Sequence, residues 1–285
     1  MHPAVKIIEC PRDAMQGIYE FIPTEQKILY LNSLLQCGFD TLDFGSFVSP
    51  KAIPQMIDSA SVLEGLTLDD TQTKLLAIIA NEKGANRACD FEQIHFLGYP
   101  FSISEEFQRR NTNASIEDSL FRLENINNIT NSNSKKLVIY ISMGFGNPYN
   151  ESWDPEIVFN WVNRLHKTFD IDIFSISDTI GCAEQKDVSY LFNNLIPALQ
   201  NVEFGAHMHV LKENANQIIS SAYNAGCRRF DGAIKGYGGC PMAEDKLTGN
   251  MPTEIMLSWF ENNKIDSGID MMRFSESMKL SSSIF

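Results

Sequence analysis

The chain has 285 residues, and 44% of them are hydrophobic, so it can bury a large core as one large domain or two small ones. Its formal net charge of −13 argues against a nucleic-acid-binding protein and against a protein that binds an anionic membrane surface. A small anionic substrate is still compatible with this charge, because it needs only a local positive site.

The cysteines and the N-terminus point to a cytoplasmic protein. The six cysteines are scattered without a CxxC pair, which in a chain of this length indicates reduced thiols rather than a disulfide framework. Residues 1–10 lack the apolar core of a signal peptide, and no apolar run approaches the length of a membrane span. We therefore expect a soluble protein with no nucleic-acid or membrane partner.

Short β-prone runs alternate with helical patterns along the whole chain. The expected strands, in chain order, cover residues 5–9, 39–44, 74–80, 94–97, 136–142, 171–176, 203–209 and 227–234. The expected helices cover residues 24–37, 53–63, 115–126, 155–169, 184–195 and 214–226. The Asn/Ser-rich stretch 127–134 is expected to form an exposed loop.

Regular β/α alternation predicts a parallel sheet, and eight units in a chain of this length favour a closed (β/α)₈ TIM barrel of the α/β class. A doubly wound open sheet is the alternative. No Pro/Gly/Ser-rich linker divides the chain, so we expect a single catalytic domain over residues 1–262. The pattern dissolves after Asn262 and does not predict how the tail, residues 263–285, packs.

The seventh expected strand ends in His207-Met208-His209. Residues two apart on a strand point to the same side, so the two imidazoles project together at a spacing that one metal ion can bridge. The alternative is a pair of unrelated histidines near a loop. Polar residues at the ends of other strands favour the metal site, because in a barrel these ends meet at one face.

Several candidate residues follow strands in this way. Arg12 and Asp13 follow the first strand, Asp43 lies on the second, Ser142 ends the fifth, Asp178 follows the sixth, and Cys240 and Asn250 lie beyond the eighth. Asp13, His207, His209 and Asn250 form a mixed nitrogen and oxygen set that favours Mg²⁺ or Mn²⁺ over structural Zn²⁺. Asn250 is also compatible with a plain turn in Thr248-Gly249-Asn250.

The loop 236–240 carries three glycines before Cys240. It lacks the Lys-Ser/Thr ending of a Walker phosphate loop. It is either a turn with an inert thiol or a mobile segment that presents Cys240 as an acid or base.

Five segments together resemble the hydroxymethylglutaryl-CoA lyase family, which belongs to the metal-dependent aldolase and lyase TIM barrels. They are PRDAMQG (11–17), SFVSPKAIPQM (46–56), SDTIG (177–181), HMH (207–209) and GGCP…TGN (238–250). They occur in the family's order and extend the resemblance to about residue 262. The SFVSPK and GGCP segments favour the lyases over the related synthases, which usually carry extra domains.

The resemblance implies a role for each matching residue. Asp13, His207, His209 and Asn250 match the metal ligands, in agreement with the set inferred from the strand ends. Arg12 matches the arginine that stabilises an enolate, Asp178 a catalytic acid/base, and Cys240 a proton-transferring cysteine. Glu254 matches a glutamate near the asparagine ligand. Barrel lyases often pair, so a homodimer is expected.

The sequence also departs from the family pattern. The list of departures is Asp43 in place of glutamate, Ala14 in place of glycine, Val210 in place of aspartate, a missing Asn-Glu-Lys run after Gln16, and one residue fewer before Pro11. Asp43 is counted as a catalytic candidate, although loss of one methylene is expected to move its carboxylate out of catalytic reach. These departures indicate a divergent branch.

The resemblance implies a divalent-metal-dependent carbon–carbon lyase that cleaves hydroxymethylglutaryl-CoA to acetoacetate and acetyl-CoA, as in leucine degradation. One alternative is a lyase or condensing enzyme for a related 3-hydroxyacyl-CoA. Another is a non-catalytic barrel that binds metal or acyl-CoA, since this fold hosts many functions.

Overall fold

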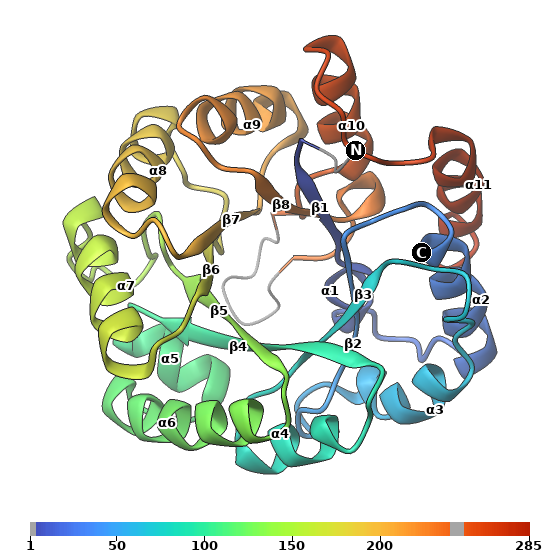
Figure 1. Cartoon of the computed structure of the whole chain (residues 1–285), viewed down its shortest axis with the longest axis horizontal. Coiled ribbons are helices and arrows are strands. Elements are labelled where there is room, and N and C mark those ends of the chain that lie inside the picture. Colours follow the sequence, from blue (N-terminus) through green and yellow to red (C-terminus); the bar gives the residue numbers. More distant parts are fainter. Residues whose placement is uncertain (1–3, 240–247) are drawn as a thin grey trace.

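The computed structural model describes residues 4–239 and 248–285, and a closed barrel of eight parallel strands forms its centre. The strands pair in chain order, and β8 returns to pair with β1, with Lys6 opposite Arg229. This last pairing confirms the predicted barrel, because an open doubly wound sheet would leave two unpaired edges. Figure 1 looks down the barrel and shows the helices as a ring around it.

All eight expected strands are present, with small shifts at their ends. They are β1 (Lys6–Glu9), β2 (Thr41–Ser46), β3 (Lys74–Ile78), β4 (Ile94–Ser102), β5 (Lys136–Ser142), β6 (Ile173–Asp178), β7 (Glu203–Met208) and β8 (Arg229–Gly232). The largest difference is β4, which was expected to end at Leu97 and continues to Ser102 beside β5.

The helices, in chain order, are α1 (Pro11–Gln16), α2 (Thr24–Leu35), α3 (Ser59–Glu64), α4 (Glu82–Cys89), α5 (Glu105–Thr112), α6 (Ile116–Ser132), α7 (Pro155–Phe169), α8 (Gln185–Ala198), α9 (Ala215–Asn224), α10 (Thr253–Asn262) and α11 (Met271–Ser281). Most helices lie on the outside of the barrel between successive strands, while α1 lies at its carboxyl end and α10 and α11 follow β8. Three 3₁₀ turns, η1 (Pro54–Met56), η2 (Lys212–Asn214) and η3 (Ile234–Gly236), lie in the connections. Among residues 4–239 and 248–285, no helix is both long and apolar enough to span a bilayer.

Side chains on the strands alternate between the barrel interior and the helices. On β7 and β8, Phe204, Ala206 and Phe230 join the large apolar cluster that the barrel shares with the helices. The residues between them face inward, where His207 pairs in register with Asp231. This alternation determines which strand-end side chains can reach the site.

The Asn/Ser-rich stretch after residue 126 is helical, so the expected exposed loop is wrong. α6 continues to Ser132 because Ile126 and Thr130 are both buried on its inner face. The Thr130 hydroxyl donates to the Ile126 carbonyl at 2.7 Å, and the Asn127 amide donates to the Phe169 carbonyl at 2.7 Å. The prediction failed because this part of α6 buries few apolar side chains, and its many Asn and Ser residues resemble those of a loop.

The tail beyond residue 262 is packed against the barrel. α11 lies beside α2 (Figure 1), and Phe274 makes an edge contact with Phe39 at a centroid distance of 6.3 Å. The Ser277 hydroxyl lies 3.4 Å from the Cys37 thiol, and the Asp270 amide donates to the Cys37 carbonyl at 2.8 Å. The boundary expected at residue 262 therefore separates two helices that share one core.

Candidate active site

The first strand positions two of the predicted residues through the short helix that follows it. β1 ends at Glu9, and α1 begins at Pro11, whose missing N–H and fixed φ suit a first helical position. Arg12 and Asp13 therefore lie in the first turn at the carboxyl end of the barrel. Both are buried, at 7% and 5% exposure.

Asp13, His207 and His209 converge as the sequence predicted. Each offers a ligand atom within 4.8 Å of the others. The Asp13 Oδ2 atom lies 3.9 Å from His209 Nε2. This distance is too long for a hydrogen bond, but two ligand atoms of one small cation can lie this far apart. Among the described residues, the buried Asp13 Oδ2 has no hydrogen-bond donor. These three side chains therefore fit a divalent cation.

Asn250, the fourth predicted ligand, lies beside this cluster and comes from a different part of the chain. It is 2% exposed, and its backbone forms an isolated antiparallel β-bridge with that of His209. Its amide Nδ2 donates to the Tyr237 carbonyl at 2.8 Å. An asparagine binds a cation only through Oδ1, so a fixed partner for Nδ2 defines which way Oδ1 points.

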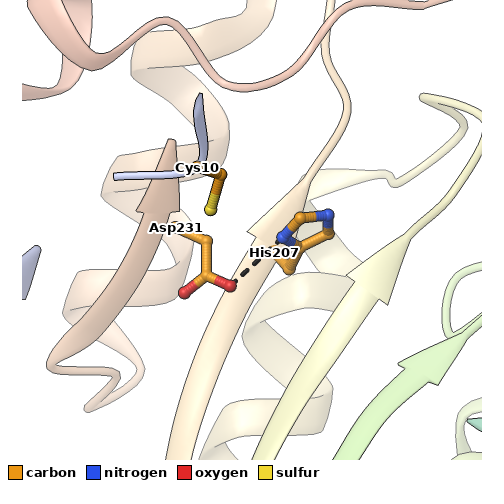
Figure 2. A group of neighbouring side chains, drawn as sticks. All are labelled: Cys10, His207 and Asp231. Atoms are coloured by element: carbon orange, nitrogen blue, oxygen red, sulfur yellow. Dashed lines mark hydrogen bonds and ion pairs between the residues drawn. The ribbon is translucent and has the colours of Figure 1, made fainter. Parts of the chain in front are cut away.

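Asp231 is a site residue that the sequence reasoning missed. His207 Nδ1 donates to Asp231 Oδ2 at 3.1 Å, and Cys10 lies within 4.8 Å of both (Figure 2). This bond leaves His207 Nε2 as the ring nitrogen that is free to accept a proton or a cation. Carboxylates commonly orient metal-ligating histidines in this way. An available signal was the alternation in Arg229-Phe230-Asp231, which places a carboxylate on the inner face.

The pKa values of the two histidines shift in opposite directions. Burial alone would lower the pKa of His207, but the hydrogen bond and charge of Asp231 raise it above its ordinary value. Burial lowers the pKa of His209 to about 4. His209 is therefore held as the neutral imidazole, the form in which a histidine can bind a metal ion.

Arg12 and Asp43 form a buried ion pair. Arg12 Nη2 lies 2.5 Å from Asp43 Oδ2, and Nε donates to the same oxygen at 3.0 Å. Burial raises the pKa of Asp43 to about 6, against the opposing charge of Arg12. In the structure the shorter side chain of Asp43 directly contacts the guanidinium of Arg12. Arg12 Nη1 also donates to Asp13 Oδ1 at 3.0 Å.

Asp178, the predicted acid/base, is hydrogen-bonded to the loop that follows β6. Ser177 lines the cavity, and Asp178, the next residue on β6, points to the other side. Its Oδ1 accepts from the Gly181 and Cys182 amides at 2.9 and 3.1 Å, and its Oδ2 accepts from the Ala183 amide at 2.8 Å. Burial raises the pKa of Asp178, although these bonds oppose the shift. The carboxylate holds the loop after β6.

A cavity of about 370 Å³ opens over these residues. Its polar side includes Arg12, Asp13, His207 and His209, with Ser142 from the end of β5. Its apolar lining includes Val48, Ile53, Ile78 and Phe107. Cys240 lies outside the described residues, while Gly236, Tyr237 and Gly238 of the preceding loop lie beside Asn250.

The closed barrel and the Asp-His-His cluster beside a buried arginine define an α/β-barrel protein with a candidate divalent-metal centre at the carboxyl ends of its strands. Comparison with known proteins then identifies the family. The HMGL-like family model matches residues 4–280, and the chain belongs to that family.

Named relatives and solved structures agree with this assignment. The chain is 30% identical to the zebrafish (Danio rerio) protein named cytoplasmic 3-hydroxy-3-methylglutaryl-CoA lyase, over 95% of this chain and 80% of that one. It is 31% identical to a Pseudomonas aeruginosa 3-hydroxy-3-isohexenylglutaryl-CoA/hydroxymethylglutaryl-CoA lyase, over 94% and 88%. An Acinetobacter baumannii HMG-CoA lyase, solved with coenzyme A and 3-methylmalate, matches with a TM-score of 0.91 and 27% identity, over 98% and 90%.

Proposed function

We propose that this chain is a divalent-cation-dependent lyase that cleaves 3-hydroxy-3-methylglutaryl-CoA to acetoacetate and acetyl-CoA. The observation that carries the proposal is the Asp13–His207–His209 cluster, which lies on one cavity with the buried guanidinium of Arg12. The reaction is proposed because the similar proteins are named as lyases of hydroxymethylglutaryl-CoA. Mg²⁺ or Mn²⁺ is the proposed cation because every ligand is oxygen or imidazole nitrogen.

We propose that Asp13, His209 and Asn250 would hold the cation, and that His207, the remaining predicted ligand, serves as the base that lies beside them. When bound, it would act as a Lewis acid that lowers the pKa of the substrate's C3 hydroxyl. The hydroxyl proton passes to His207, which lines the cavity and is held by Asp231. A nitrogen cannot hold a proton and a cation together, so His207 Nε2 must be free of the cation in this step.

The bond between C2 and C3 then breaks. Its electron pair remains on C2 as the enolate of acetyl-CoA, and C3 becomes the ketone of acetoacetate. Arg12 offsets the enolate charge, and Asp43 fixes the guanidinium through three hydrogen bonds. Cys240 is the proposed donor of the proton that converts the enolate to acetyl-CoA.

An acyl-CoA substrate would meet two guanidinium groups in the cavity. Arg12 and Arg110 are both among its lining residues, and Arg110 is half-exposed at the end of α5. Each is ion-paired, Arg12 with Asp43 and Arg110 with Glu106, so they offer N–H donors to an anionic substrate rather than an excess of positive charge. We further propose that the protein is cytoplasmic and forms a homodimer, which fractionation and light scattering would test.

A second candidate substrate has a longer alkyl group at C3. The Pseudomonas aeruginosa relative is named for an isohexenyl substrate as well as the methyl one. The apolar lining of Val48, Ile53, Ile78 and Phe107 provides a surface that such a chain could contact. Turnover of 3-methyl and 3-isohexenyl substrates, compared by kcat/KM, distinguishes the two.

The test is acetoacetate release from hydroxymethylglutaryl-CoA with Mg²⁺ or Mn²⁺ and then with chelator. We expect cation-dependent turnover that falls about 10²–10³-fold in Arg12→Lys, by analogy with loss of an oxyanion donor. Cys240→Ala should lower turnover about 10²-fold or more, as for loss of a general acid. Cys89→Ala removes a thiol at the end of α4 and serves as its control. A folded sample that binds Mn²⁺ without releasing acetoacetate would refute the reaction.

A further inference from the structure

The last residues of the chain reach the loop that follows β8, at Lys235 and Tyr237. The C-terminal segment, Ser282–Phe285, follows α11. The Phe285 ring stacks on Tyr237, with centroids 4.4 Å apart and an interplanar angle of 17°. The Ser282 hydroxyl accepts a hydrogen bond from Lys235 Nζ. Two side chains of the C-terminal segment thus contact the residues that flank Gly236.

Phe285 also contacts the side of the barrel that carries Asp13. Its ring makes an edge contact with Tyr30 at 5.9 Å, and it packs with Ile284 against a small cluster formed by Met15, Ile22 and Met56. Met15 lies on α1, two residues after Asp13. The Phe285 ring therefore contacts both the apolar cluster that includes Met15 of α1 and Tyr237 in the loop after β8.

The contact with Tyr237 continues to a proposed cation ligand. The Tyr237 carbonyl accepts from Asn250 Nδ2 at 2.8 Å and so sets the direction of Oδ1. The next residue, Gly238, has φ +90°, and a Cβ there would lie 2.7 Å from the Asp13 carbonyl and 2.9 Å from Asn250 Nδ2. The backbone at 237–238 is thus confined between α1 and Asn250, and a shift of Tyr237 would move the Asn250 amide.

We propose that Phe285 is a positioning residue for the cation site, acting through the stack on Tyr237 and the Tyr237 carbonyl on Asn250. This inference rests on the proposed function in requiring that Asn250 ligate a cation. It assigns a specific role to the tail, which the sequence left without a predicted packing. An ordinary packing role for Phe285 would affect stability and leave cation affinity unchanged.

The test is Mn²⁺ affinity, measured by calorimetry or electron paramagnetic resonance on the full chain without substrate. We expect Phe285→Ala to weaken Mn²⁺ binding about 3–10-fold, at or below the lower end of the range for residues that support a ligand directly. Phe285→Tyr keeps a flat ring and should restore the affinity. Met272→Ala truncates an apolar side chain on α11 that is 66% exposed, and it should bind Mn²⁺ as the wild type does.

A second pair of variants separates positioning from loss of fold. Phe285→Leu keeps apolar volume without the stack, so it should weaken Mn²⁺ binding with little change in thermal midpoint. Tyr237→Ala should have a similar effect, and the double variant should be no weaker than either single one, because both remove the same contact.

The outcomes are distinguishable. If the wild type does not bind Mn²⁺, the proposed cation site fails. If the wild type binds Mn²⁺ and Phe285→Leu binds it equally well, the site stands and the positioning role is overturned. Additive losses from Phe285→Leu and Tyr237→Ala would also overturn it.

Discussion

His207 and His209 lie two residues apart at the end of one strand, but their imidazoles have different surroundings. The His207 side chain is 13% exposed and is held by Asp231, while the His209 side chain is 4% exposed and faces Asp13. Their pKa values shift in opposite directions for these reasons. Groups whose surroundings separate their proton affinities in this way commonly serve different roles in one site.

We predict that His209→Ala and His207→Ala will fail in different ways. His209→Ala should weaken Mn²⁺ binding more than about tenfold, because it removes an enclosed neutral ligand. His207→Ala should retain more of the Mn²⁺ affinity and lose turnover about 10²-fold or more, as expected for a proton acceptor. Calorimetry with Mn²⁺ and single-turnover acetoacetate release measure the two effects. Equal loss of Mn²⁺ affinity in both variants would make His207 purely a ligand.

The connection from β6 to α8 depends on one side chain. Asp178 accepts several backbone N–H groups within residues 180–183, and so satisfies donors that a tight loop would leave unpaired. Gly181 in this loop has φ +73°, a conformation that favours glycine. The SDTIG segment is therefore a structural turn at the rim of the cavity, to which Ser177 and Thr179 contribute lining side chains.

Asp178→Asn is expected to destabilise the protein without weakening its cation site. The amide would point an N–H₂ group at backbone donors, with a loss of about 1.5–3 kcal/mol in unfolding free energy, the range for hydrogen bonds to a charged group. Denaturant unfolding and Mn²⁺ titration test this. Glu184→Gln changes an exposed residue just past the loop and should have little effect on stability. Unchanged stability with a large loss of turnover would instead support the acid/base role.

At the scale of the whole molecule, Glu9 links the first strand to the last barrel unit. It is fully buried on β1, where its Oε1 accepts from the Ile234 amide at 2.8 Å and its Oε2 accepts from the Thr253 hydroxyl at 2.6 Å. Burial raises the pKa of Glu9 from 4.5 to about 8, against these two bonds. The closure of the barrel therefore contains a carboxyl group that favours its protonated form.

This raised pKa makes stability depend on pH. The folded state holds the proton more tightly than the unfolded state, so the contribution of Glu9 is full below about pH 4.5 and is lost as pH rises to about 8. One such proton corresponds to about 1.4 kcal/mol per pH unit within that window. Glu9→Gln imitates the protonated group, so its unfolding free energy should fall less steeply over this range than that of the wild type.

Chemical denaturation at a series of pH values measures this difference. Glu64→Gln, at the exposed end of α3, is the matched control and should follow the wild type. Parallel curves for the wild type and Glu9→Gln would show that Glu9 is charged in the folded protein.

The local sequence determined the barrel and much of the candidate site. Apolar runs and caps located the strands and the helix from Pro155 to Phe169, because both depend on residues close in the chain. The pairs Arg12-Asp13 and His207-x-His209 each lie within one local element. Their convergence followed from the rule that strand ends meet at one face of a barrel.

The tertiary structure decided which side chains turn toward the cavity and which distant groups support them. The inward alternation on β6 turns Asp178 away, and the register of β7 and β8 brings Asp231 to His207. The positions of Asn250 and Phe285 depend on contacts between segments far apart in the chain, through Tyr237. Such contacts form only when the barrel closes, and periodicity along one segment carries no information about them.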